Sequence, residues 1–351
     1  MEVHGTGKSF FTKLMILRNY INNINGYIFD IEGEYIDIVN KCNGTILDNN
    51  KCYNILEINN YDLCENYLVN KCNEVISYIL DLTENNENKE YIKTNKDKLI
   101  NIILNVYNSY DITEDIESIY NTDKNYINKK IKNSNCFPTL NDINEYIKMK
   151  CKNIRSKFEK EIYLKFNEIL NQIIIQYKNF SNHTNVNIYD DIVCFNLKNI
   201  DKDKVINISK ILLKLINKKL AKKENKTLIY IDEFWKYIFY DKDLANMILE
   251  LFKTIRKNNA GIIVITQDIC DVFSNNDLGK SIINNSCFCV LFKMEYSEKE
   301  ELSKSSMGFY NITNMVQSLG KGNCILKINS NIVKMEIVAS ENEVNLVKGD
   351  F

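Results

Sequence analysis

The stretch Gly5-Thr6-Gly7-Lys8-Ser9, which stands directly before the run SFFTKLMILRNY (9–20), decides how the sequence is interpreted. The run has apolar residues at helical spacing and predicts a helix that begins at the glycine-rich loop. Glycines permit close backbone approach, and the N–H groups at a helix N-terminus bind phosphate. In a phosphate-binding loop the lysine, here Lys8, neutralises phosphates and the hydroxyl of Ser9 ligates Mg²⁺. The stretch therefore indicates a nucleotide site, with an ordinary turn before a helix as the alternative.

The front edge of this loop departs from the pattern GxxxxGK[ST], because Glu2 stands where the first glycine is expected. A phosphate-binding loop also follows a buried strand, and too few residues precede Gly5 to form one. We therefore expect a chain that is truncated at its N-terminus. The loop would then be poorly anchored, and residues 1–351 would hydrolyse ATP weakly or not at all.

Two later strand-like segments carry the partners that such a loop needs. LIYIDE (228–233) is an apolar run that ends in Asp232 and Glu233, suited to holding Mg²⁺ and to orienting the attacking water, respectively. GIIVITQ (261–267) ends in Gln267, which is placed to sense the γ-phosphate. Arg256 is a candidate for a group that reaches the phosphate of a neighbouring subunit. The alternatives are strands that end in polar loops and a solvated arginine at a helix end.

Composition and charge narrow the class of protein. The chain has 351 residues, 45% of them hydrophobic, which is enough for one large α/β domain with an insertion. Its formal net charge of -1 gives no indication of a nucleic-acid or membrane partner. The 11 cysteines form no CxxC pair, and no apolar run reaches the length of a membrane span. Without a secretory signal, these features predict reduced thiols and a cytosolic protein.

Strand-like and helix-like segments alternate along much of the chain. The expected strands are 26–30, 45–47, 53–56, 191–197, 227–233, 260–268, 287–292, 323–328 and 331–338. Such alternation predicts an α/β fold with a mainly parallel sheet and crossover helices. Residues 61–180 are mainly helical in pattern, with a helix that opens at Pro138-Thr139. We therefore expect a core of residues 1–60 and 181–351, interrupted by a helical insertion at 61–180.

Several segments together resemble a known family. They are GTGKSFFTK, FDIEGEY, FPTLNDINEYIK, HTNVNIYDDIVCFNL, LIYIDEFWKYI, RKNNAGIIVITQD and SIINNSCFCVLFK, in this order. The set is similar to the C-terminal motor domain of the conjugation and type IV secretion channel ATPases, which are RecA-like P-loop translocases. The resemblance extends from Gly5 to about Glu343. The sequence departs from it at Glu2, at Ile31 in place of a proline, and at Phe234 in place of a small residue.

The resemblance implies a set of site residues. It makes Gly5, Thr6, Gly7, Lys8, Ser9 and Phe10 the ATP-binding loop. It makes Ser9 and Asp232 ligands of Mg²⁺, with Asp232 as the Walker B acid. Glu233 becomes the catalytic carboxylate, Gln267 the sensor and Arg256 the trans-acting group. Asp30 and Glu34 are expected near the nucleotide.

The resemblance also implies function and partners. It predicts an ATPase motor that energises conjugative DNA transfer or type IV secretion, working as a hexamer against channel proteins. Single-stranded DNA or a relaxase is the expected substrate, and the expected location is the cytoplasm at the inner face of the membrane. The alternatives are a related DNA-pumping translocase and a catalytically impaired fragment without the first strand and the channel-docking domain.

Overall fold

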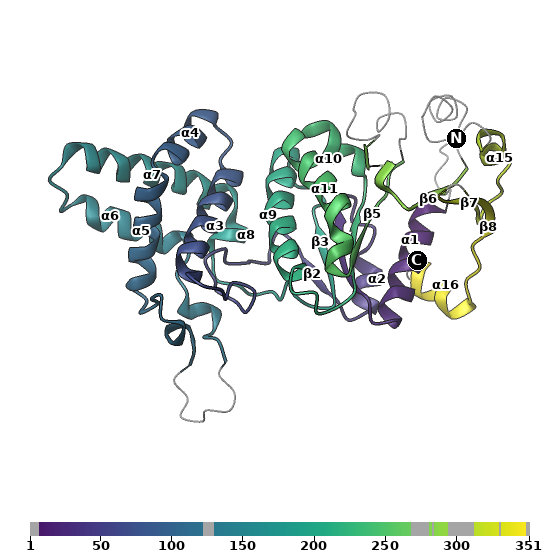
Figure 1. The fold of residues 1–351 in the computed structure, drawn as a ribbon, viewed down its shortest axis with the longest axis horizontal. Helices are drawn as coiled ribbons and strands as arrows, with labels where there is room; N and C mark the ends of the chain where they lie inside the picture. The colour runs from purple at the N-terminus through teal and green to yellow at the C-terminus, as the bar shows by residue number, and fades with distance from the viewer. Residues whose placement is uncertain are drawn as a thin grey trace. The chain divides into compact units, whose positions relative to one another are not determined.

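A computed structural model describes residues 7–121, 130–267, 281–282, 284–293, 312–329 and 331–348 (Figure 1). The chain forms two compact units. One contains Met1–Ile46 and Tyr189–Phe351, and the other contains Leu47–Ile188. The sequence placed these junctions at 60/61 and 180/181.

The first unit is built on a five-stranded sheet in the order β2-β3-β1-β4-β5. Its strands are β1 (Asn25–Asp30), β2 (Thr45–Leu47), β3 (Ile192–Asn196), β4 (Thr227–Ile231) and β5 (Ala260–Val264). The pairs β1/β3, β1/β4 and β4/β5 are all parallel, with Ile28 of β1 level with both Cys194 and Tyr230. The six residues of β1 are all buried, as the continuous apolar run of a central parallel strand requires. The predicted α/β fold with a mainly parallel sheet is confirmed.

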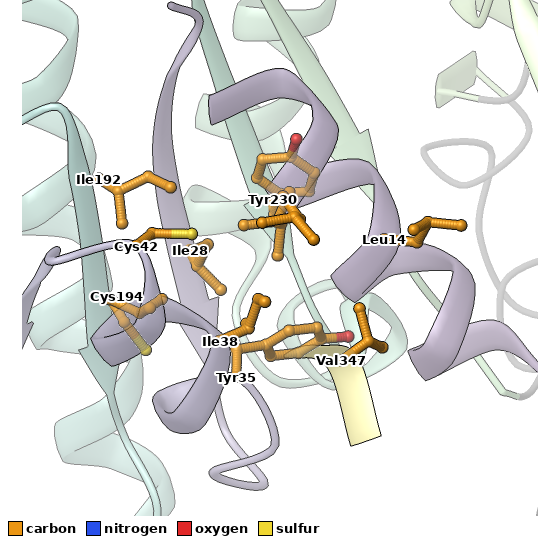
Figure 2. Packing of buried hydrophobic residues seen from close by; sticks show 12 residues of the cluster. Leu14, Ile28, Tyr35, Ile38, Cys42, Ile192, Cys194, Tyr230 and Val347 are labelled. Atoms are coloured by element: carbon orange, nitrogen blue, oxygen red, sulfur yellow. The ribbon is translucent and has the colours of Figure 1, made fainter. Parts of the chain in front are cut away.

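Helices cover both faces of this sheet. On one face, α1 (Lys8–Ile21), α2 (Ile36–Lys41) and α16 (Glu341–Lys348) enclose a core with Ile28 and Tyr230 at its centre (Figure 2). Figure 2 shows Leu14 of α1 and Val347 of α16 pointing into this core. On the other face lies α9 (Lys202–Leu220), whose Lys219 ammonium stands 5.3 Å from the Tyr27 ring centroid. The helices α10 (Phe234–Tyr240) and α11 (Lys242–Thr254) and the 3₁₀ turn η3 (Ile255–Asn258) connect β4 to β5.

A second, three-stranded sheet is antiparallel, whereas the sequence predicted only a mainly parallel sheet. It comprises β6 (Phe288–Leu291), β7 (Asn323–Ile328) and β8 (Asn331–Glu336), and both of its pairs are antiparallel. The reason lies in the connection, because Ile328 pairs directly with Asn331 across a tight turn that holds Asn329 at φ 53°. A parallel pair needs a crossover of a dozen or more residues. The short helix α15 (Thr313–Gln317) precedes β7.

The unit Leu47–Ile188 is helical and has a hydrophobic core of its own. Its elements are α3 (Tyr67–Leu82), α4 (Asn86–Thr94), α5 (Lys96–Asn108), η1 (Ile116–Ile119), η2 (Ser134–Cys136), α6 (Leu140–Cys151), α7 (Lys157–Gln176) and α8 (Lys178–Ser181). Leu99, Ile103, Phe137 and Phe166 are fully buried. The predicted helix start at Thr139 is confirmed, since its N–H donates to the Asp142 carboxylate at 2.8 Å. Among the described residues, no helix has the length and hydropathy needed to cross a membrane.

The predicted strand at 53–56 is wrong. Asn54 instead forms a local turn, in which its side-chain oxygen accepts the N–H of Leu56 at 3.0 Å and its amide group donates to the Pro138 carbonyl at 2.9 Å. Asparagine side chains compete with strand pairing in this way. The apolar Ile55 and Leu56 are buried within the helical unit, which explains the strand-like pattern.

Candidate nucleotide site

The candidate site lies where the parallel strands of the five-stranded sheet end. Asp30 closes β1, Asp232 and Glu233 follow β4, and Thr266 and Gln267 follow β5. Because these strands are parallel, their carboxyl ends meet at one edge of the sheet, where α/β folds bind ligands. The start of α1 reaches the same edge, since the Lys8 ammonium lies 3.4 Å from the Thr266 carbonyl oxygen.

The first turn of α1 has the features of an anion site. Gly7 is the N-cap residue with φ 93°, a left-handed conformation that glycine adopts without strain. The N–H of Phe11 donates to the Gly7 carbonyl at 2.9 Å and closes the first helical turn. No acidic residue stands in this turn, so the partial positive charge of the helix N-terminus is not offset there. Gly5 and Thr6, which the sequence predicted in the loop, lie outside the described residues.

The next three predicted loop residues differ in what they offer a ligand. Lys8 and Ser9 are half-buried, and they stand in the first turn of α1. The Phe10 side chain packs against the core beneath α1. Phe10 therefore has only its backbone to contribute to a ligand, because its ring is engaged elsewhere.

Asp232 is a buried carboxylate with like charges around it. Its backbone N–H donates to the Phe29 carbonyl at 3.1 Å, which extends the β1/β4 ladder by one residue. The residue is only 5% exposed. Burial and then the neighbouring charges of Glu233, Glu34 and Asp30 raise the pKa of Asp232 to about 7. A divalent cation would relieve this repulsion and favour the ionised form, so the donor set fits Mg²⁺.

Glu233 is held in an unusual backbone conformation. It has φ 47° and ψ 47°, in the left-handed region that few residues other than glycine adopt. The turn is fixed by the N–H of Phe234, which donates to the Ile265 carbonyl at 2.8 Å. The Glu233 side chain accepts a hydrogen bond from the indole N–H of Trp235 at 2.5 Å. Strained conformations of this kind are concentrated at functional sites.

Asp30 is committed to a loop and not to a ligand. Its two carboxylate oxygens accept the N–H groups of Gly33, Glu34 and Tyr35 at 2.7, 3.0 and 2.9 Å. Burial raises the pKa of Asp30 against the opposing effect of these hydrogen bonds. The carboxylate therefore shapes the loop that follows β1, while the half-buried Glu34 is carried by that loop toward Asp232.

The structure does not bring all predicted site residues together. Gln267 is exposed just beyond β5, at the same edge of the sheet as Asp232. Arg256 is exposed in η3, which precedes β5, and so it lies at the opposite end of that strand. Arg256 is thus remote from the Asp232 edge of its own chain.

Trp235 is the residue that sequence reasoning missed. Its ring is half-buried and its N–H reaches Glu233. The available signal was an N–H donor two positions after Glu233.

Comparisons with known proteins show the family and the fold of this chain. The model of the TraG P-loop domain family matches residues 1–344. VirB4 of Thermoanaerobacter pseudethanolicus is similar in structure, with a TM-score of 0.70 and 19% identity over 97% of this chain and 89% of that chain. The bacterial conjugative coupling protein TrwBdeltaN70 has a TM-score of 0.57 and 10% identity over 97% and 84% of the two chains. The plasmid coupling protein TrwB in complex with the non-hydrolysable GTP analogue GDPNP has a TM-score of 0.58 and 9% identity over 96% and 84%.

The comparison with curated proteins found no match. The structural similarities, all below 25% identity, show a shared P-loop NTPase fold. The family match covers nearly all of the sequence. This chain therefore belongs to the TraG P-loop domain family.

Proposed function

We propose that this chain is an ATP-hydrolysing motor that energises conjugative DNA transfer or type IV secretion. The observation that carries the proposal is the meeting of three features at one sheet edge. These are the Lys8 end of α1, the Asp232-Glu233 pair after β4 and the end of β5. Family membership and the shared fold with VirB4 and TrwB support the same activity.

The residues take the following roles in this proposal. Lys8 and the N–H groups at the start of α1 bind the β- and γ-phosphates, with the Gly5-Thr6 backbone completing the loop. Ser9 and Asp232 hold Mg²⁺, which when bound neutralises the phosphate charge. Glu233 accepts a hydrogen bond from the attacking water and orients it in line with the γ-phosphate.

The two carboxylates are suited to different tasks because their surroundings differ. Neighbouring negative charges repel the ionised Asp232 carboxylate, and a bound cation offsets this repulsion. Glu233 instead has a neutral hydrogen-bond donor on its carboxylate. Gln267, exposed beyond β5, would respond to the γ-phosphate. It directly follows Ile265 and Thr266, whose carbonyls contact Phe234 and Lys8.

The proposal extends to assembly and partners. We infer a hexamer in which each nucleotide site lies at a subunit interface, with Arg256 of one subunit facing the phosphates of the next. The inferred partners are channel proteins of the secretion system, with single-stranded DNA or a relaxase as substrate, at the cytoplasmic face of the membrane.

The first test is the substitution Lys8→Ala. Loss of the ammonium removes the main cation from the phosphate site, and we expect ATP turnover to fall about a hundredfold or more. Lys13→Ala is the matched control, because Lys13 lies on the same helix but is one turn beyond the loop. Turnover is measured as phosphate release, and binding is measured by titration with a fluorescent ATP analogue. Equal turnover in Lys8→Ala and in the unaltered chain would contradict the proposal.

A further inference from the structure

The indole of Trp235 makes a short contact with the carboxylate of Glu233. The Nε1 atom donates to Oε2 at 2.5 Å, across only two positions of the chain. The contact is possible because Glu233 adopts the left-handed conformation and Trp235 lies in the first turn of α10. The side chains of both residues are thereby directed to the same side of the turn.

Backbone hydrogen bonds hold the turn that carries the Glu233 carboxylate. Glu233 is 5% exposed. The N–H of Phe234 donates to Ile265 of the adjacent strand, and the carbonyl of Glu233 accepts the N–H of Lys236 at 2.9 Å. The remaining freedom of Glu233 is in its side-chain torsions, which the indole restrains.

The indole is in turn held by its neighbours. Its ring centroid lies 6.1 Å from that of Tyr240, and the Lys236 ammonium stands 5.7 Å from the ring centroid. The Lys202 ammonium of α9 lies 3.1 Å from the Tyr240 ring centroid. The Lys236 ammonium also pairs with Glu32 in the loop that follows β1. The ring therefore packs against residues of α10. Through Lys236 it is also connected to the loop after β1, which Asp30 shapes.

We propose that Trp235 is a positioning residue for Glu233, a role that rests on the proposed ATPase function. Its N–H occupies one carboxylate oxygen and leaves the other oxygen to accept the hydrogen bond of the attacking water. Tryptophan suits the task because its indole is a donor only and carries no charge. It restrains the carboxylate without neutralising its charge. A lysine or arginine in the same place would neutralise that charge.

A spectroscopic test follows from the fact that Trp235 is the only tryptophan of the chain. Protein labelled with ¹⁵N at the indole gives a single indole N–H resonance. A hydrogen bond to a carboxylate places the proton of this resonance downfield. We expect Glu233→Gln, which has a neutral oxygen in the same place, to move it upfield. Phe158→Leu is the control, because Phe158 is 66% exposed on α7 of the helical unit, and it should leave the resonance in place.

A kinetic test separates positioning from folding. Trp235→Phe keeps an aromatic ring and removes the donor, and we expect kcat to fall about tenfold while KM changes less than about twofold. Trp235→His restores an N–H donor and should recover part of kcat. Phe158→Leu should retain the kcat of the unaltered chain.

Two results would overturn the proposal. One is an indole resonance that does not respond to Glu233→Gln, and the other is an unchanged kcat in Trp235→Phe. The resonance test needs no turnover, so it stands apart from the proposed function. Failure of that function would appear instead as turnover that is insensitive to Lys8→Ala.

Discussion

Gly7 begins α1 in a conformation that side chains disfavour. Its φ of 93° places it in the left-handed region, and a Cβ there would lie 3.7 Å from the nearest atom of the Phe292 ring, an ordinary contact. The cost of Gly7→Ala is therefore backbone strain of about 1–2 kcal/mol, and not a steric clash. We expect this variant to lose both stability and affinity for ATP, because the strain falls on the phosphate-binding turn.

Gly322 provides the matched control for this prediction. It has φ 82°, and a Cβ would meet nothing within 4 Å. Gly322→Ala should lose a similar amount of stability in chemical denaturation and keep the ATP affinity of the unaltered chain. If Gly7→Ala also keeps that affinity, the turn at Gly7 is not part of the nucleotide site.

Single residues were predicted from the sequence where a chemical pattern fixes the position. GKS before a helix and DE after a strand indicated Lys8, Ser9, Asp232 and Glu233, and the structure gives them the expected positions on their elements. The pattern did not reveal that Phe10 packs into the core. It also did not reveal the Trp235 contact, which depends on the left-handed turn at Glu233. No residue type in that turn is specific for such a conformation.

At the scale of elements, α11 depends on one capping residue. Asp241 accepts the N–H of Leu244 at 2.7 Å and pairs with the Lys210 ammonium of α9 at 2.8 Å. We expect Asp241→Ala to lower the free energy of unfolding by about 1 kcal/mol for the cap and by a further contribution for the partly buried ion pair. Asp241→Asn keeps a capping oxygen and should lose less. Urea denaturation of the two variants measures the difference, and equal stabilities would show that the cap contributes nothing.

The same residue gives a pH dependence with a defined sign. Burial acts to raise the pKa of Asp241, but the hydrogen bonds from Lys210 and the Leu244 N–H outweigh it and hold the pKa below its usual value. A lowered carboxyl pKa stabilises the fold above the unfolded value of about 3.9 and loses this contribution as the pH falls through the folded pKa. The stability gap between the unaltered chain and Asp241→Asn should thus be constant above about pH 5 and shrink on acidification. A gap that widens toward low pH would contradict this assignment.

Elements were predicted well where the apolar pattern was long. The strands at 26–30, 191–197 and 227–233 and the helix after Gly7 agree with β1, β3, β4 and α1. The sequence did not predict to which sheet each strand belongs, because this depends on the length of the connections between strands. The two-residue link from β7 to β8 forces an antiparallel pair.

At the scale of the whole molecule, the unit Leu47–Ile188 has the properties of an independent domain. Its two ends are tied to each other, because the Tyr53 N–H donates to the Asn179 carbonyl at 2.7 Å and the Cys52 N–H donates to Asn185 at 2.8 Å. It also has its own buried core. We expect residues 47–188 to fold alone, with a helical circular dichroism spectrum and a cooperative thermal transition. A non-cooperative melt would show that the unit needs the rest of the chain.

The proposed trans role of Arg256 is tested by mixing subunits. Arg256→Ala and Glu233→Gln should each lower ATP turnover strongly when alone. A mixture contains interfaces where an intact Glu233 meets an intact Arg256 of the neighbour, and we expect part of the turnover to return there. The exposed position of Arg256, at the end of β5 opposite to the Asp232 edge, supports this expectation. A mixture no more active than its components would exclude the trans role.

The pairing of β1 with β3 has a consequence for how the chain reaches its native state. Gly26 pairs with Ile192, so the central pair of the sheet joins segments on either side of the helical unit. Bringing such distant segments together is slow, since the entropy cost of loop closure rises by about 0.6 kcal/mol for each doubling of the loop. The Cys52–Asn185 and Tyr53–Asn179 bonds shorten the effective loop once the helical unit has formed. We therefore expect folding of the inserted unit to precede and accelerate assembly of the sheet that carries the candidate nucleotide site.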